Sequence, residues 1–171
     1  MTVIVGQGSE RDPESLQLFT RTRVFIPNEQ RGEGSPAIMK TATELWCKSF
    51  PTATLRSASQ RYNCVGMVFA ARRTWVDPQE LEMILREDGF RIVEDITDVF
   101  AGDVVVYGDP KTRKPEHIGL VLEKIPNPSD ASWDLRVLSQ WGRDGEYVHE
   151  LNSLPELLGE VLSFWTDRVV L

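Results

Sequence analysis

The chain has 171 residues, of which 41% are hydrophobic and 26% are charged, the composition of one ordinary globular domain with its own core. Its 26 acidic residues outnumber its 19 basic residues, so the formal net charge is −7 and we expect no nucleic-acid partner, because phosphate binding needs a basic surface. The first residues lack the basic start and apolar core of a signal peptide, and no window approaches the roughly 18 apolar residues of a membrane span. We therefore expect a cytoplasmic protein with no membrane partner, and its oligomeric state stays open.

The first third of the chain predicts one helix after a polar stretch. A short strand is expected near 23–26, before a loop rich in Gly and polar residues. Apolar residues at helical spacing in "AIMKTATELWCKSF" then predict a helix that Pro51 ends, with Cys47 buried inside its apolar stripe. A polar connection over 52–62 follows.

Two more helices are predicted after this connection. One begins at Cys64, where the sequence changes from polar to apolar residues. The other opens at Pro78 with Asp77 as its N-cap and ends at Gly89. Its apolar side consists of Leu81, Ile84 and Leu85.

The second half of the chain predicts antiparallel strands. Four runs rich in β-branched residues stand between turn residues, and "QWGRDGEY" has the character of a hairpin connection. The end of the chain is expected to be helical as far as Gly159. Helices followed by strands, without alternation, indicate an α+β fold. The four runs are "GDVVVYGD", "HIGLVLEKI", "LRVLSQW" and "GEYVHEL".

The first candidate for chemistry is Cys64. A sulfur at the start of a helix lies near unpaired backbone N–H groups, which lower a thiol pKa and offer donors to an oxyanion. Two cysteines, Cys47 and Cys64, are too few for a disulfide framework, so both are expected as free thiols. The alternative is that Cys64 is a buried apolar residue, which is common for free cysteines.

A base for this thiol has two candidates, His117 and His149. Strand alternation places His117 on one face with Gly119, and a glycine there lets another element approach closely. If that element is the Cys64 helix, thiol and imidazole meet; the alternative is a surface histidine at the start of a strand. His149 lies among polar residues near a strand end and is the weaker candidate.

A third group would orient the imidazole. Gln140 and Ser139 end the strand that follows the His117 strand. The side-chain oxygen of Gln140 can accept a hydrogen bond from the ring N–H and fix its tautomer, and a serine can do so less firmly. We predict Gln140, with Ser139 and His149 as alternatives.

The order "NCVG", "GDVVVY", "HIGLVLE" and "VLSQWG" resembles the NlpC-type and CHAP-type papain-like cysteine hydrolases. Their pattern is a "DCSG" helix start, a "GDLVFF"-like strand, an "HVGIY"-like strand and a polar third residue. The resemblance covers roughly residues 60–150 and implies Cys64 as nucleophile, His117 as base, and Ser139 or Gln140 as the third residue. It also implies helices packed on a small antiparallel sheet, with no metal and no cofactor. Asn63 stands where the pattern has Asp, and Val65 where it has Ser.

The sequence thus predicts a single papain-like domain over 1–171, with a catalytic core at 60–150 and an N-terminal extension or cap at 1–45. The expected activity is hydrolysis of an amide bond in a peptide, an isopeptide or a side-chain amide, through a thioester acyl-enzyme. An acyltransferase or a catalytically inactive binding module on the same fold is the alternative. The sequence offers no phosphate loop at "VGQGSE" and no spacing typical of a calcium or zinc site.

Overall fold

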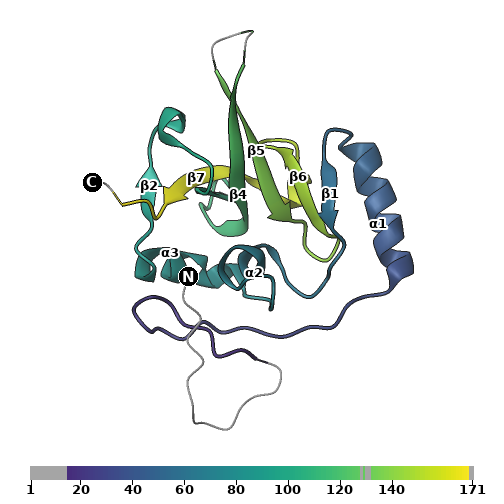
Figure 1. The fold of residues 1–171 in the computed structure, drawn as a ribbon, viewed down its shortest axis with the longest axis horizontal. Coiled ribbons are helices and arrows are strands. Elements are labelled where there is room, and N and C mark those ends of the chain that lie inside the picture. The colour runs from purple at the N-terminus through teal and green to yellow at the C-terminus, as the bar shows by residue number, and fades with distance from the viewer. Residues whose placement is uncertain (1–14, 128, 130–131, 170–171) are drawn as a thin grey trace.

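The computed structural model describes residues 15–127, 129 and 132–169. Residues 1–14, on which the expectations about a signal peptide and the "VGQGSE" motif rest, lie outside this part. The described chain forms a seven-stranded antiparallel sheet in the order β1-β6-β5-β4-β3-β7-β2, with three α-helices (Figure 1). The helices are α1 (Pro36–Ser49), α2 (Cys64–Phe69) and α3 (Leu81–Glu87). The strands are β1 (Thr54–Ser57), β2 (Arg91–Val93), β3 (Val104–Gly108), β4 (Pro115–Pro126), β5 (Trp133–Gln140), β6 (Glu146–Glu150) and β7 (Glu160–Thr166).

The α+β class is confirmed, and so are the four predicted strands, which are β3 to β6. The three predicted helices also form, although the third begins as a 3-10 turn, Pro78–Glu80, before α3. The Asp77 side chain caps that turn by accepting from the backbone N–H of Gln79 at 2.9 Å. Gly89 adopts a left-handed φ of 76° just after α3, as a C-terminal stop requires.

The expectation of a helix near the C-terminus is wrong. Only a short 3-10 turn forms at Glu156–Leu158, and β7 follows it. β7 pairs with β3 on one side and with β2 on the other. Two rows of backbone hydrogen bonds outweigh the local helical preference of this stretch, because propensity is a weak signal beside tertiary pairing.

Three shorter predictions also need correction. β1 forms inside the expected polar connection, because it finds β6 as a partner at the edge of the sheet. β2, for which no element was predicted, begins at Arg91 and pairs with β7 at the other edge. No strand forms at 23–26; within the described residues an isolated bridge joins Phe19 to Phe25. Cys47 is exposed, not buried, because it lies beyond the side of α1 that packs on the sheet.

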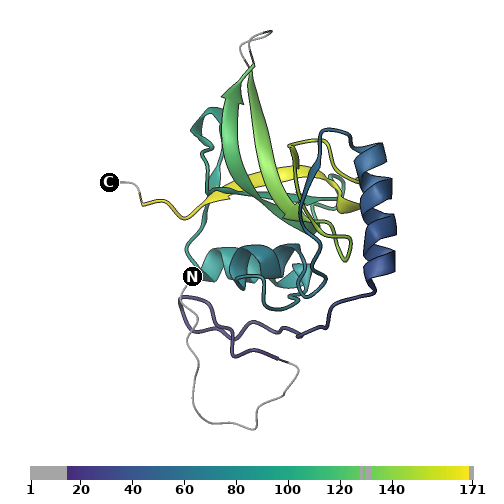
Figure 2. The same ribbon diagram turned by 45° about the vertical axis from the view of Figure 1, so that its right-hand side comes forward.

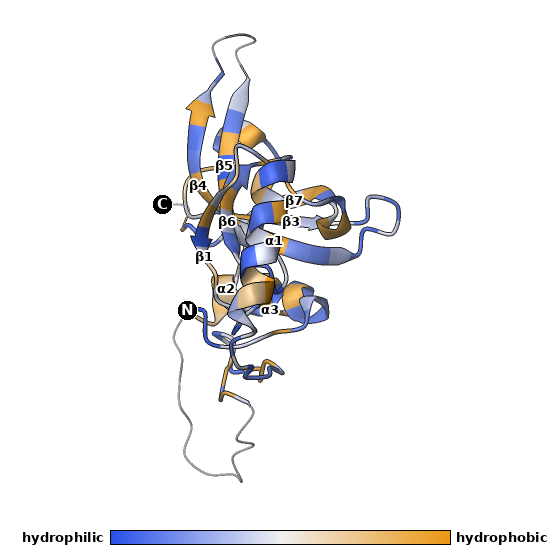
Figure 3. Cartoon of the chain, turned by 90° about the vertical axis from the view of Figure 1, so that its right-hand side faces the viewer, coloured by the Kyte–Doolittle hydropathy of each residue, from blue (hydrophilic) through white to orange (hydrophobic). Residues whose placement is uncertain are grey.

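The two faces of the sheet carry separate cores. α2 and α3 cover one face, where Cys64, Val65 and Ile84 pack against Val104 and Ile118. The other face packs Val105, Tyr107, Val137, Trp141 and Tyr147 together, with Trp46 and Phe50 at the end of α1 against them. α1 stands beside the β1 edge of the sheet (Figure 2) and mixes polar with apolar residues along its length (Figure 3).

The segment before α1 runs along α2 and α3 on the side away from the sheet (Figure 1). Leu18 and Ile26 are fully buried in the core that contains α2. The Asp88 carboxylate, after α3, accepts the backbone N–H of Arg21 at 2.7 Å. The described part of this segment therefore belongs to the folded domain. Among the described residues, no helix has the length and apolar character needed to cross a membrane.

Candidate active site

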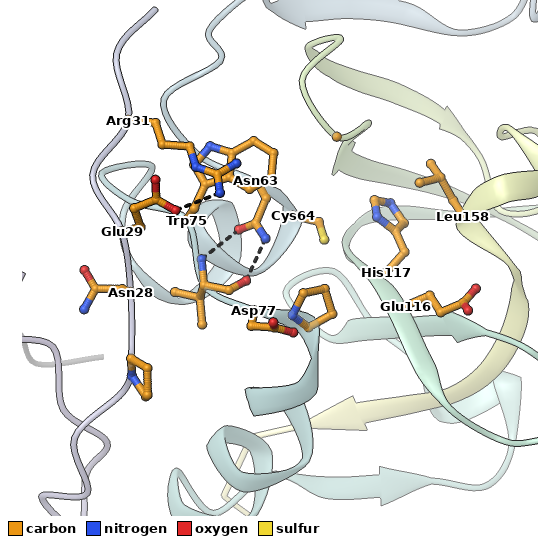
Figure 4. A pocket seen from close by; sticks show the side chains of 14 residues that line it. Asn28, Glu29, Arg31, Asn63, Cys64, Trp75, Asp77, Glu116, His117 and Leu158 are labelled. Atoms are coloured by element: carbon orange, nitrogen blue, oxygen red, sulfur yellow. Dashed lines mark hydrogen bonds and ion pairs between the residues drawn. The ribbon is translucent and has the colours of Figure 1, made fainter. Parts of the chain in front are cut away.

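A pocket of about 490 Å³ opens where the start of α2, the start of β4 and the N-terminal segment come together (Figure 4). Cys64 and His117 both line it. The other lining residues come from the N-terminal segment (Pro27, Asn28, Glu29, Arg31), the α2 cap and the following loop (Asn63, Trp75, Val76, Asp77, Pro78), Glu116, Gly142 and Leu158.

Asn63 fixes where the Cys64 helix begins. Its side-chain oxygen accepts from the backbone N–H of Gly66 at 3.0 Å, which is an N-cap bond, and from that of Val76 at 3.2 Å. Its side-chain N–H donates to the Val76 carbonyl at 2.6 Å. One asparagine therefore joins the first turn of α2 to the loop that forms the pocket wall, which a serine or alanine in its place would not do.

Cys64 is the first residue of α2 and is 5% exposed. Burial raises the pKa of its thiol to about 11, because the thiolate loses its water. The backbone N–H groups of Ile118, Val65 and Cys64 itself act in the opposite direction, because they favour negative charge on the sulfur. The thiol is therefore protonated at neutral pH, and these donors face any negative charge that forms there.

His117 is 1% exposed in β4, and its ring centroid lies 5.6 Å from that of Tyr107. Burial, and then the charge of His149, lower the pKa of His117 to about 3. Its Nε2 atom is buried and has no hydrogen-bond partner among the described residues. The imidazole is thus neutral at pH 7, so one of its two ring nitrogens carries a hydrogen and the other a lone pair that can accept a proton.

The predicted role of Gly119 in bringing helix and histidine together is wrong. A side chain at Gly119 would lie 2.4 Å from Val137 Cγ1, so β5 occupies that space. α2 instead packs on the neighbouring residue, Ile118, because alternate strand residues point to opposite faces. The sulfur of Cys64 reaches the backbone of Ile118, which directly follows His117, and both side chains meet the pocket there (Figure 4).

The predicted third group, Gln140, lies buried at the end of β5. Its amide nitrogen donates to the carbonyl oxygens of Ser59 and Gly142, at 2.9 and 3.2 Å. Its Oε1 atom is buried without a partner in the described chain, and the structure records no hydrogen bond between Gln140 and His117. The orienting role of Gln140 stays a prediction.

The two alternatives to Gln140 lie against each other. The Ser139 hydroxyl and His149 Nε2 are 2.8 Å apart, and His149 Nδ1 lies 2.8 Å from the Glu150 carbonyl oxygen. Since a carbonyl only accepts, Nδ1 carries the hydrogen and Ser139 donates to Nε2. Trp141 Nε1 in turn donates to the Ser139 oxygen at 3.1 Å. His149 is also near enough for its charge to lower the pKa of His117.

Sequence patterns did not reveal the wall opposite β4. The backbones of Glu29 and Trp75 exchange two hydrogen bonds of 2.9 Å, which tie the N-terminal segment to the loop after α2. Arg31 lies 4.1 Å above the Trp75 ring and bonds to Glu29 at 2.7 Å. These contacts join positions far apart in the chain, so no local periodicity predicts them. Trp141 does not line this pocket and stacks on Tyr147 in the core.

The described residues contain no group of three or more His, Cys, Asp or Glu side chains arranged to hold a metal ion. No protein-family model, curated protein or solved structure matches the chain. The pocket brings together a buried thiol, a neutral imidazole and backbone N–H donors.

Proposed function

We propose that this protein is a cysteine-dependent hydrolase of an amide bond, with a papain-like arrangement of helix and sheet. The observation that carries the proposal is that Cys64 and His117 line one pocket, with the sulfur at the backbone of Ile118. A thiol, a base and converging N–H donors are the parts that acyl transfer needs. The substrate is a peptide, an isopeptide or a side-chain amide.

In the proposed reaction His117 removes the Cys64 proton as the sulfur attacks the substrate carbonyl. Because burial raises the pKa of the thiol and lowers that of the imidazole, the resting pair is neutral, and the proton moves together with the attack. Backbone N–H groups beside Cys64 hold the oxyanion. The protonated His117 then gives its proton to the leaving amine, and water hydrolyses the thioester with His117 again as base.

Gln140 is the orienting group in this proposal, and the Ser139–His149 pair is the alternative. Nε2 of His117 and Oε1 of Gln140 are both buried without partners among the described residues, which makes each available to a polar neighbour. The pair has the advantage that its own hydrogen bonds already fix its orientation.

One observation favours a second function, that of a binding module without catalysis. Cys64 is 5% exposed within an apolar cluster, as a structural cysteine would be. In that case the pocket walls, with Arg31 and Trp75, bind a ligand and the sulfur only fills space. Reactivity of the thiol separates the two functions.

Iodoacetamide labelling in a Cys47→Ser background tests the proposal, because Cys47 is exposed and would react regardless of catalysis. We expect Cys64 to be labelled at pH 7 and the rate to drop at least tenfold in His117→Ala. Without the base, the remaining rate should rise with pH towards the raised pKa of the thiol, about 11. Mass spectrometry of the Cys64 peptide measures both rates.

A panel of peptide, isopeptide and side-chain amide substrates, with hydroxylamine present, then tests for the thioester. Hydroxamate product that disappears in Cys64→Ala indicates the acyl-enzyme, and acceleration by added amines indicates acyl transfer. Equal labelling of Cys64 with and without His117 would contradict the proposed hydrolase and support the binding module.

A further inference from the structure

Glu146 is a buried carboxylate that the proposed reaction does not use. It lies on β6 and is 1% exposed. It binds one side chain that precedes α2 in the chain and one that follows it. Arg72 donates to it twice, from Nε at 2.8 Å and from Nη2 at 3.1 Å. The Tyr62 hydroxyl donates to it at 3.0 Å, and burial raises the pKa of Tyr62, so this donor keeps its proton at neutral pH.

The turn after α2 is one that non-glycine residues avoid. Ala71 and Arg72 have φ values of 50° and 62°, two successive left-handed residues. Such a conformation costs free energy and persists where the surroundings hold it. The Arg72 N–H bonds to the Gly66 carbonyl at 3.0 Å and the Arg73 N–H bonds to the Ala70 carbonyl at 3.1 Å. The two-point contact between Arg72 and Glu146 adds to this restraint, because a guanidinium and a carboxylate joined by two bonds fix direction as well as distance.

This turn leads back to the start of α2. After it, the Thr74 carbonyl lies so close to Gly66 that any side chain there would be 1.8 Å from it. Val76 then binds both ends of the Asn63 side-chain amide. Tyr62, the other partner of Glu146, directly precedes Asn63. Both contacts of Glu146 therefore converge on the residue that caps α2 at Cys64.

We infer that Glu146 is a positioning residue for Cys64: through Arg72 and Tyr62 it fixes both ends of α2 and so holds the sulfur against the backbone of Ile118, beside His117. This inference rests on the proposed role of Cys64 as the nucleophile. Glu146 lies on a different strand from His117 and outside the lining of the pocket.

The Asp103–Arg168 ion pair offers a matched control. It too joins a buried carboxylate to two guanidinium nitrogens, at 3.0 and 2.8 Å, and the exposure of its side chains matches that of the Glu146–Arg72 pair. Neither Asp103 nor Arg168 lines the pocket. Glu146→Gln and Asp103→Asn thus remove the same charge from similar surroundings, and only the first should affect Cys64.

The experiment compares these variants in the Cys47→Ser background by two readouts. One is the rate of iodoacetamide labelling of Cys64 at pH 7, and the other is hydrogen exchange of the Gly66 amide, which Asn63 holds. We expect Glu146→Gln to slow labelling about tenfold and to speed Gly66 exchange at least tenfold, after correction for its measured loss of global stability. Asp103→Asn should leave both at the wild-type value after the same correction.

A double-mutant cycle tests the route. In an Arg72→Met background, Glu146→Gln should change either quantity less than threefold further, because both substitutions release the same turn. If Glu146→Gln does not fold, Arg72→Lys, which keeps the charge but loses the two-point contact, replaces it with the same expected directions. The inference is overturned if Glu146→Gln alters Gly66 exchange no more than Asp103→Asn. Since that exchange needs no reactive thiol, it decides the inference even if labelling shows no dependence on His117.

Discussion

At the scale of single residues, the thiol and the two histidines of the candidate site are buried and neutral at pH 7. Burial raises the pKa of Cys64 and lowers those of His117 and His149, to about 11, 3 and 4. Each pKa shift arises because the charged form of the group is disfavoured once it has lost its water. The N–H donors around Cys64 are satisfied best when negative charge forms on the sulfur or on a bound oxygen. In the proposed reaction, the site would therefore stabilise charge that develops during the attack more than charge on the resting groups.

These histidines make stability depend on pH. Their folded pKa values lie below the value of about 6.5 for an unfolded histidine, so between those values the unfolded chain binds more protons. Stability should therefore fall as the pH drops below about 6.5, by about 1.4 kcal/mol per pH unit for each histidine. We expect urea unfolding at pH 7 and pH 5 to differ by about 4 kcal/mol from the two groups together.

A His149→Gln variant provides the check on this assignment. It should remove about half of the difference in unfolding free energy between pH 7 and pH 5, because His117 then titrates alone. An unchanged difference would show that carboxylates or other groups, not the buried histidines, set the pH dependence.

At the scale of elements, α2 is a six-residue helix that local propensity would not stabilise alone. Its position depends on the Asn63 cap, on packing against Ile118, and on the turn that crosses its first residues. Gly66 is what allows that crossing, since its missing side chain leaves room for the Thr74 carbonyl. The nucleophile candidate is thus held by contacts to three separate parts of the chain.

Gly66→Ala should displace the turn after α2. Its Cβ would lie 1.8 Å from the Thr74 carbonyl oxygen, and backbone on both sides cannot yield cheaply. We expect a loss of at least about 2 kcal/mol of unfolding free energy, in the range of overpacked cores, and slower labelling of Cys64. Gly32→Ala is the matched control, since nothing lies within 4 Å of its new side chain. Equal unfolding free energies for the two variants, measured in urea, would refute the steric account.

At the scale of the whole molecule, the segment before α1 contributes both to the core and to the wall of the pocket. Leu18 and Ile26 complete the core under α2 and α3, and Glu29 and Arg31 form the wall of the pocket opposite β4. The core and the pocket therefore depend on the same stretch of chain. A change that releases this segment should weaken both stability and the site.

Ile26→Ala tests that dependence. The side chain is fully buried, so its truncation should cost about 2–5 kcal/mol of unfolding free energy and expose Trp75 to a fluorescence quencher. Val24→Ala, at a position that is 40% exposed, should cost less than about 1 kcal/mol. If Ile26→Ala were as stable as Val24→Ala in denaturant unfolding, the segment would be an appendage and not part of the core.

Local patterns were sufficient for much of this protein. Turn residues and hydrophobic periodicity act within a few residues of each other, so they were enough to predict the α+β class, the helix start at Cys64 and the four strands from β3 to β6. The residue pattern also identified Cys64 and His117 as the candidate thiol and base.

Only tertiary contacts made residues 160–166 a strand between β3 and β2, left Cys47 exposed, and turned Ile118 rather than Gly119 towards α2. Such contacts alone placed Glu29, Arg31 and Trp75 in the pocket wall and joined Glu146 to both ends of α2. The reason is that strand pairing, burial and salt bridges join residues far apart in the chain, and their free energies exceed the local preferences that a sequence displays.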